Sequence, residues 1–101
     1  MRELLQNWIE TRRTDLAKIG ITTGEVHMGP NVPPKPGLYV DHDTSTALGR
    51  IVIWESGEME VEVISAEDGK QLFWKYYELE GEPNFDLLLQ NYLNALTEVN
   101  S

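Results

Sequence analysis

Two histidines, His27 and His42, are the residues of this chain whose imidazoles could act as acid–base groups or metal ligands. His42 lies between Asp41 and Asp43, and a carboxylate beside an imidazole can orient it for general base catalysis. Mixed carboxylate and imidazole groups also suit divalent metal ions. Adjacent residues of a strand or turn point apart, however, so these three side chains cannot converge. Because such a tripeptide is also ordinary turn sequence, we expect no catalytic residue, metal site or cofactor here.

Paired carboxylates recur in the segment that contains Glu58, Glu60 and Glu62. A hydrolase pair needs one acid in an apolar pocket that raises its pKa, whereas residues two apart on a strand share one solvated face. Ser56 and Ser65 lack the G-x-S-x-G context of a nucleophile, and no glycine pattern matches a phosphate-binding loop. We therefore predict that this protein is not an enzyme.

Composition narrows the class of partner. The chain has 101 residues and 41% of them are hydrophobic, which predicts a single domain over residues 1–101. Its 17 Asp and Glu against 8 Lys and Arg give a formal net charge of −9. This charge opposes binding to nucleic acid or to an anionic membrane and permits a basic protein partner. The chain has no cysteine, no signal peptide pattern and no membrane span, so we expect it in the cytoplasm.

Hydrophobic periodicity predicts a helix near each end of the chain. Apolar residues recur at helical spacing over Leu4–Ile19, and Gly20 is a natural stop. Asn84 is placed to cap a second helix, whose apolar stripe extends over Phe85–Val99.

Between these helices the apolar period changes to two, which predicts strands. The strand segments are Ile21–Met28, Leu38–Asp41, Leu48–Glu55, Glu58–Ile64 and Gln71–Leu79. Short turns make neighbouring strands antiparallel, and the proline-rich segment 29–37 is expected to be a surface connection. The predicted fold is α+β: an N-terminal helix, an antiparallel meander of four to five strands and a C-terminal helix, with both helices packed on one sheet face.

Turn lengths assign the two faces of the sheet. A two-residue Ser56-Gly57 loop places Trp54 opposite Met59, and a turn over residues 65–70 places Val61 opposite Trp74. The predicted core face is Val52, Trp54, Met59, Val61, Val63, Leu72, Trp74 and Tyr76. The predicted outer face is Ile51, Ile53, Glu58, Glu60, Glu62, Phe73, Lys75 and Tyr77. This outer face is either a docking surface for a basic protein or a surface that the proline-rich loop or the first strand covers.

One hairpin resembles a known family. Residues 49–57 read G-R-I-V-I-W-E-S-G, and they are followed by M-E-V-E-V at 59–63 and F-W-K-Y-Y-E-L at 73–79. The chain is similar to TriTu immunity proteins, which accompany polymorphic toxins, including those of contact-dependent growth inhibition systems. The resemblance covers most of the chain and implies a small cytosolic protein that binds and neutralises one cognate toxin. It implies neither the contact residues nor the activity of the toxin.

The acidity of the chain and its resemblance to this family together predict that the partner is a cognate toxin domain, basic and of the nuclease type. We expect this chain to bind it as a monomer or weak dimer. The predicted partner-binding residues are Glu55, Glu58, Glu60 and Glu62, with Phe73 and Tyr77 as anchors and Asp41 and Asp43 as second choices. Two alternatives stay open. One is an acidic secretion chaperone, which usually carries a helix inserted between its strands. The other is a small enzyme or metal-dependent regulator built around Asp41, His42 and Asp43.

Overall fold

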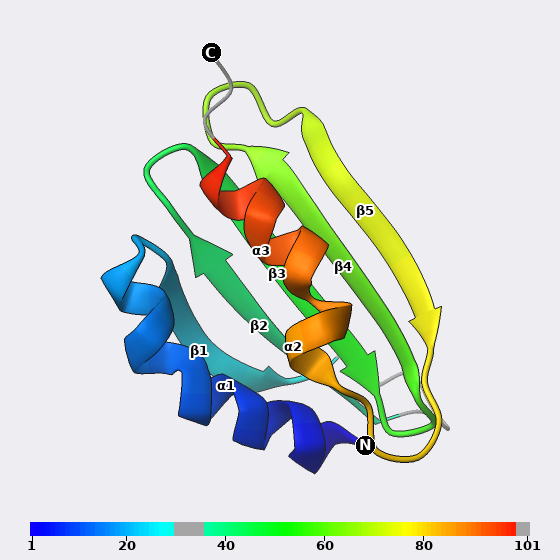
Figure 1. The fold of residues 1–101 in the computed structure, drawn as a ribbon. Helices are drawn as coiled ribbons and strands as arrows, with labels where there is room; N and C mark the ends of the chain where they lie inside the picture. The colour runs from blue at the N-terminus through cyan, green and yellow to red at the C-terminus, as the bar shows by residue number, and fades with distance from the viewer. Residues whose placement is uncertain (30–35, 99–101) are drawn as a thin grey trace.

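The computed structural model describes residues 1–29 and 36–98. Five strands form one antiparallel sheet in chain order, and the helices of the described residues lie on one side of it (Figure 1). The strands are β1 (Thr22–Met28), β2 (Gly37–Asp43), β3 (Ala47–Trp54), β4 (Glu58–Ser65) and β5 (Gln71–Glu78), and the helices are α1 (Arg2–Lys18), α2 (Phe85–Leu88) and α3 (Gln90–Thr97). The predicted α+β meander, with both terminal helical segments on one sheet face, is confirmed.

The hydrophobic core lies between the sheet and the helices. Helix α1 buries Leu5, Ile9 and Leu16 there, and β3 and β4 contribute the side chains beneath. Ile19, predicted as the last member of the α1 stripe, is 61% exposed. The reason is that α1 ends at Lys18 and the chain then turns through Gly20, whose φ of +87° suits glycine.

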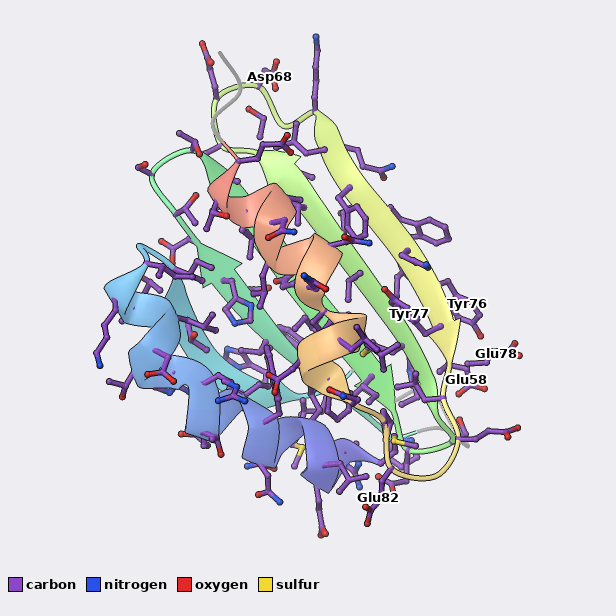
Figure 2. All side chains as sticks on the ribbon, viewed as in Figure 1. Glu58, Asp68, Tyr76, Tyr77, Glu78 and Glu82 are labelled. Atoms are coloured by element: carbon purple, nitrogen blue, oxygen red, sulfur yellow. The ribbon has the colours of Figure 1, made fainter. Side chains whose placement is uncertain are left out.

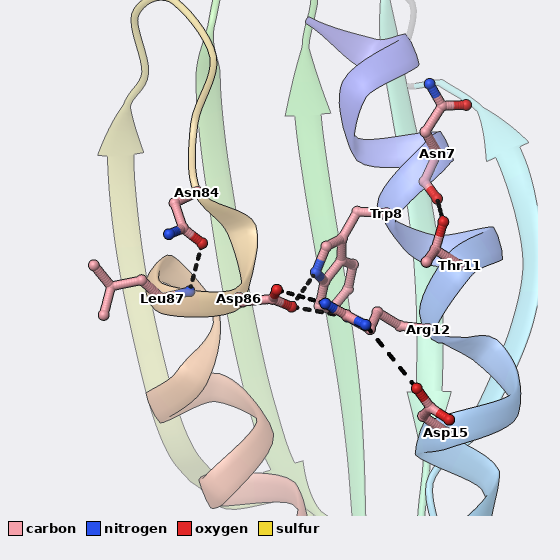
Figure 3. Close-up of polar contacts among 8 residues, drawn as sticks. All are labelled: Asn7, Trp8, Thr11, Arg12, Asp15, Asn84, Asp86 and Leu87. Atoms are coloured by element: carbon pink, nitrogen blue, oxygen red, sulfur yellow. Dashed lines mark hydrogen bonds and ion pairs between the residues drawn. The ribbon is translucent and has the colours of Figure 1, made fainter.

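The predicted C-terminal helix is two short helices. Leu89, with φ −95° and ψ 4°, separates α2 from α3. Asn84 is the N-cap of α2, as predicted, because its Oδ1 accepts a hydrogen bond of 3.2 Å from the backbone N–H of Leu87 (Figure 3). The buried side chains of this helical pair are Phe85, Leu89, Tyr92 and Leu96, whereas Val99 lies outside the described residues.

An Asn84→Ala variant is expected to lose about 1 kcal/mol of folding stability, because the α2 amide would lose its side-chain acceptor. Urea denaturation followed by tryptophan fluorescence measures the change. Asn91→Ala, on the exposed side of α3, is the control and is expected to keep wild-type stability. Equal losses in the two variants would contradict a capping role for Asn84.

Helices from opposite ends of the chain are joined through Asp86. Trp8 Nε1 donates to Asp86 Oδ1 at 2.8 Å. Arg12 donates from Nε to the same oxygen at 2.9 Å and from Nη2 to Oδ2 at 2.6 Å (Figure 3). The Arg12 guanidinium, with the indole N–H, holds the pKa of the Asp86 carboxyl below its usual value. These contacts tie α1 to α2, so both helices lie as one layer on the sheet.

The face assignment predicted for β3 is wrong. The β3–β4 loop has three residues, Glu55 to Gly57, and Ile53 therefore opposes Met59 where Trp54 was expected. Gly57 has a φ of +106°, which lets the longer loop close. A one-residue change of register moves every side chain of a strand to the other face. Ile51 and Ile53 are consequently buried under the helices, and Val52 and Trp54 lie on the opposite side.

The face assignment predicted for β5 is wrong for a different reason. The turn pairs Ile64 with Gln71, as its predicted length requires, but Leu72 then forms a bulge and Phe73 opposes Val63. From there on β5 is displaced by one residue, so Phe73, Lys75 and Tyr77 face the helix side while Trp74 and Tyr76 face away. Only β4 has the predicted faces, with Met59, Val61 and Val63 buried and Glu58, Glu60 and Glu62 on the other side.

Candidate partner-binding surface

The side of the sheet opposite the helices, called the open face below, collects residues that pair directly across the strands. One row is Asp41, Arg50, Glu62 and Trp74, and the next is His27, Tyr39, Val52, Glu60 and Tyr76. The open face also includes Asp43, Leu48, Trp54, Glu58, Ile64 and Glu78. In the described parts of the chain every helix lies on the other side (Figure 1).

The open face is not covered by the first strand, which was one predicted alternative. Strand β1 lies beside β2 at the edge of the same sheet. The other predicted cover, the proline-rich loop, falls mostly on residues 30–35, outside the described residues.

Negative charge is concentrated on the open face. Its described residues include six carboxylates and one guanidinium, which sum to 1 − 6 = −5. The carboxylates are Asp41, Asp43, Glu58, Glu60, Glu62 and Glu78, and the cation is Arg50. More than half of the chain's net charge of −9 therefore lies on one side of one sheet.

Aromatic side chains lie among these acids. Trp74 is 49% exposed, and its Nε1 donates to Glu60 Oε1 at 2.9 Å, which fixes the indole against the face. Tyr76 is 43% exposed beside it, and Trp54 is half-buried. An amphipathic aromatic that is rigid and bordered by charge is typical of residues that carry binding energy at protein interfaces.

Arg50 is engaged within the face. Its guanidinium donates to both oxygens of Asp41, at 2.6 Å and 3.0 Å, and lies 4.6 Å from the centre of the Tyr39 ring. The hydrogen bonds with Asp41 raise the pKa of Arg50. Beside this pair a groove of about 510 Å³ is lined by Asp43, Glu62 and the apolar side chains of Leu48 and Ile64, among others. The one cation of the described face is thus neutralised locally, whereas Asp43 and Glu62 border the groove.

Five of the predicted partner-binding residues share the open face: Asp41, Asp43, Glu58, Glu60 and Glu62. The two predicted anchors do not. Phe73 and Tyr77 are half-buried on the helix side, and Tyr77 Oη donates to the backbone carbonyl of Leu88 at 3.0 Å. Burial raises the pKa of Tyr77. Figure 2 shows Tyr76 and Tyr77, neighbours in sequence, directed to different sides of β5.

Glu55 is occupied within the chain. Its Oε1 lies 2.8 Å from the α-amino group of Met1, and its Oε2 accepts from Arg2 Nε at 2.9 Å. Hydrogen bonds from the amino group and then from Arg2 lower the pKa of Glu55 to about 2. This carboxylate attaches the start of α1 to the β3–β4 loop, so its charge is already balanced.

Asp41, His42 and Asp43 do not converge, as predicted. The two carboxylates are on the open face, whereas His42 is 1% exposed on the helix side. Its Nδ1 shares a hydrogen bond of 2.9 Å with Tyr92 Oη, and burial lowers the pKa of His42 to about 4. Within residues 1–29 and 36–98, no group of three or more His, Asp and Glu side chains is placed to hold a metal ion.

Sequence reasoning missed Trp54, Trp74 and Tyr76 as surface residues. For Trp54 a signal existed, because the E-S-G sequence at 55–57 also fits a three-residue loop with a closing glycine. For Trp74 and Tyr76 there was no such signal, because nothing in the local sequence indicates the bulge at Leu72.

The chain is thus an α+β domain whose open sheet face carries acidic and aromatic side chains. The protein-family model described as immunity protein TriTu matches residues 3–95, and the chain belongs to this family. The resemblance seen in the sequence is thereby confirmed, and membership implies an immunity function with a toxin as partner. No curated protein matches the chain. None of the helices in the described parts is long and apolar enough to span a membrane.

Proposed function

We propose that this protein neutralises one cognate toxin by covering a basic surface of the toxin domain with its open face. The observation that carries the proposal is the charge of that face, six carboxylates against one paired arginine. Opposite potentials accelerate encounter and disfavour other acidic partners. Family membership supports the immunity role, and the negative charge of the open face supports a basic partner.

The proposed toxin is of the nuclease type. Enzymes that cut nucleic acids hold phosphates with clustered Lys and Arg side chains. Glu60 and Glu62 would pair with such side chains, and Trp74 would pack against their aliphatic stems or a neighbouring apolar residue. Such a contact would prevent the nucleic acid from reaching the toxin's active site, and the immunity protein itself would catalyse no reaction. It would act in the cytoplasm of the producing cell, in a contact-dependent growth inhibition system.

The two alternatives are less well supported. A secretion chaperone of the expected type has a helix between its strands, whereas β3, β4 and β5 follow one another through short turns. An enzyme built around His42 would need that imidazole beside Asp41 and Asp43, but it lies on the other side of the sheet.

The role is tested with the C-terminal domain of the protein encoded immediately upstream of this gene. Inducing that domain in bacteria should arrest growth, and co-expression of this chain should restore it. Purified together, the two should form a complex with one toxin domain per chain. Growth arrest that this chain does not relieve would refute the immunity role for that pair.

The surface is tested by charge reversal. A Glu60→Lys, Glu62→Lys double variant is expected to bind the toxin domain with an association rate at least 10-fold lower and with a weaker dependence on salt, because attraction becomes repulsion at the contact. Stopped-flow or surface plasmon resonance at several salt concentrations measures both quantities.

A matched control separates contact from total charge. Glu3→Lys with Glu80→Lys gives the same net charge, −9 + 4 = −5, on exposed residues outside the open face. This control is expected to slow association only slightly. If both double variants slow association equally, the open face is not the toxin-binding surface.

A further inference from the structure

The groove on the open face lies between two rows of side chains that cross the sheet. It has a volume of about 510 Å³. One wall consists of residues that pair directly across the strands, Asp43, Leu48 and Ile64. The other wall consists of the residues two positions away on the same strands, Asp41, Arg50 and Glu62. Such rows are about 7 Å apart on one side of a sheet, so backbone forms the floor between them.

Strand β1 contributes no side chain to its end of the groove. The pairing of β1 with β2 is irregular between Thr23 and Val26, and Gly24 within this irregularity lines the groove. Because glycine has only a hydrogen in place of a side chain, this end leaves room for a side chain of a partner.

Two carboxylates of the groove have no counter-ion in the described parts of the chain. Arg50 donates to both oxygens of Asp41, so this third carboxylate is occupied. Asp43 and Glu62 are exposed, and within residues 1–29 and 36–98 neither side chain forms an ion pair or a hydrogen bond. They lie on opposite walls, on β2 and on β4. The groove therefore carries 1 − 3 = −2 charges, located at Asp43 and Glu62.

Apolar side chains lie between these two charges. Leu48 pairs with Asp43 on one side and with Ile64 on the other. Leu48 is 45% exposed, and Ile64 is half-buried beside it. Lys and Arg side chains pack their methylene stems on apolar surface while their charged ends contact acids. The groove therefore fits a long basic side chain better than it fits a small hydrated cation.

This basic side chain belongs to a different protein. Each arginine of the chain pairs with a carboxylate of its own chain: Arg2 with Glu55, Arg12 with Asp86, Arg13 with Glu10 and Arg50 with Asp41. A second copy would have to break one of these pairs to place an arginine in the groove. Two copies of net charge −9 also repel one another, whereas a basic protein is attracted.

We propose that the groove binds one arginine side chain of the protein that docks on the open face. Its guanidinium would lie between Asp43 and Glu62, and its aliphatic stem would pack on Leu48 and Ile64. This inference rests on the proposed function, in which the docking protein is the toxin domain. It names the chemical group of that domain that the groove selects.

Arginine suits this groove better than lysine does. A guanidinium is planar and has five N–H donors, so it can donate to carboxylates on opposite walls at once. It is also less strongly hydrated than an ammonium group, which favours a groove bordered by Leu48 and Ile64. Arg50 does not oppose its entry, because Asp41 balances the charge of Arg50.

Titration with N-acetyl-arginine amide tests the groove without any toxin. In NMR spectra of protein with isotope-labelled methyl groups, the resonances of Leu48 and Ile64 should shift and saturate with a Kd of about 1 to 10 mM. N-acetyl-lysine amide should bind about 3-fold more weakly, and uncharged N-acetyl-norleucine amide should give no saturable shift. Equal binding of the arginine and norleucine amides, or tighter binding of the lysine amide, overturns the proposal.

A pair of isosteric variants assigns the binding to the two carboxylates. Asp43→Asn with Glu62→Gln should abolish the saturable shifts. Glu78→Gln with Glu80→Gln has the same net charge, −9 + 2 = −7, outside the groove and should keep them. Circular dichroism establishes that both variants are folded. Equal loss of binding in the two variants overturns the assignment to Asp43 and Glu62.

The complex with the toxin domain supplies the second test. Asp43→Asn with Glu62→Gln should raise the Kd of the complex about 30-fold, chiefly through faster dissociation, because the bound guanidinium would lose both acceptors. Replacing the toxin's arginines by alanine one at a time should identify one substitution that adds no further loss to this variant. If the toxin effects are additive for every arginine, no arginine of the toxin lies in the groove.

The proposed function and this inference can fail separately. Saturable binding of the arginine amide by a chain that forms no toxin complex would refute the proposed function and leave the groove an arginine site. A toxin complex that Glu60→Lys with Glu62→Lys weakens, but Asp43→Asn with Glu62→Gln does not, would preserve the proposed function and overturn the inference.

Discussion

Between pH 6.5 and pH 4, the wild-type protein is expected to lose about 3 kcal/mol of folding stability that a His42→Gln variant retains. His42 is buried between β2 and α3, and its imidazole contacts the hydroxyl of Tyr92 at 2.9 Å. Burial lowers the pKa of His42 to about 4 from 6.5, and Arg13 contributes in the same direction while Asp41 opposes it.

The sign follows from proton binding in each state. Above pH 6.5 His42 is neutral whether the chain is folded or unfolded, so its titration does not affect stability. Below pH 6.5 the unfolded chain binds a proton that the folded chain excludes until pH falls to about 4. Stability is therefore full above pH 6.5, falls through this window and changes no further below it on account of His42.

Urea denaturation at pH values from 7.5 to 4 measures this difference. Glutamine can still hydrogen-bond Tyr92 but does not titrate, so the wild type and His42→Gln should diverge as pH falls. His27→Gln, which changes the exposed histidine stacked 5.0 Å from Tyr39, should follow the wild type. Parallel curves for the wild type and His42→Gln would show that His42 is not desolvated in the folded protein.

Gly49→Ala is expected to lower folding stability by about 2 to 3 kcal/mol. Gly49 lies on the buried side of β3, beneath Tyr92 and Leu96 of α3. An added Cβ would lie 2.5 Å from Tyr92 Oη and 2.9 Å from Leu96 Cδ2. Tyr92 cannot move away freely, because His42 holds its hydroxyl, so α3 itself must shift.

Thermal and urea denaturation measure the effect, with Gly24→Ala as the control. Gly24 lies on the edge strand β1, where the atom nearest to an added Cβ would be the Asp41 carbonyl oxygen, at 3.1 Å. A loss of folding stability below about 1 kcal/mol is expected for this control. A Gly49→Ala variant as stable as the wild type would show that α3 is not seated tightly on β3.

The acidic strand and the helix cap were readable from local sequence. The alternation of Glu58, Glu60 and Glu62 with apolar residues follows from the geometry of a strand, and the cap at Asn84 follows from local hydrogen bonding. The segments 49–57, 59–63 and 73–79 together likewise indicated the immunity family, which the match over residues 3–95 confirms.

The faces of β3 and β5 were decided by the tertiary structure. A strand's side chains alternate whatever the register, but which set is buried depends on loop length and bulges. The third residue of the β3–β4 loop moved Ile51 and Ile53 inward, and the bulge at Leu72 moved Trp74 outward. One extra loop residue and one bulge thus place Trp54, Trp74 and Tyr76 on the open face, where the sequence had predicted Phe73 and Tyr77 as anchors.

By itself, the sequence determined the α+β class, the order of the elements, the acidity of β4 and the family. Only the tertiary structure decided which aromatic residues accompany those acids, that Glu55 is paired at the start of α1, and that His42 faces Tyr92. The physical reason is that local propensity acts over a few residues. The register of strands and the pairing of charges are settled by contacts between segments far apart in the chain.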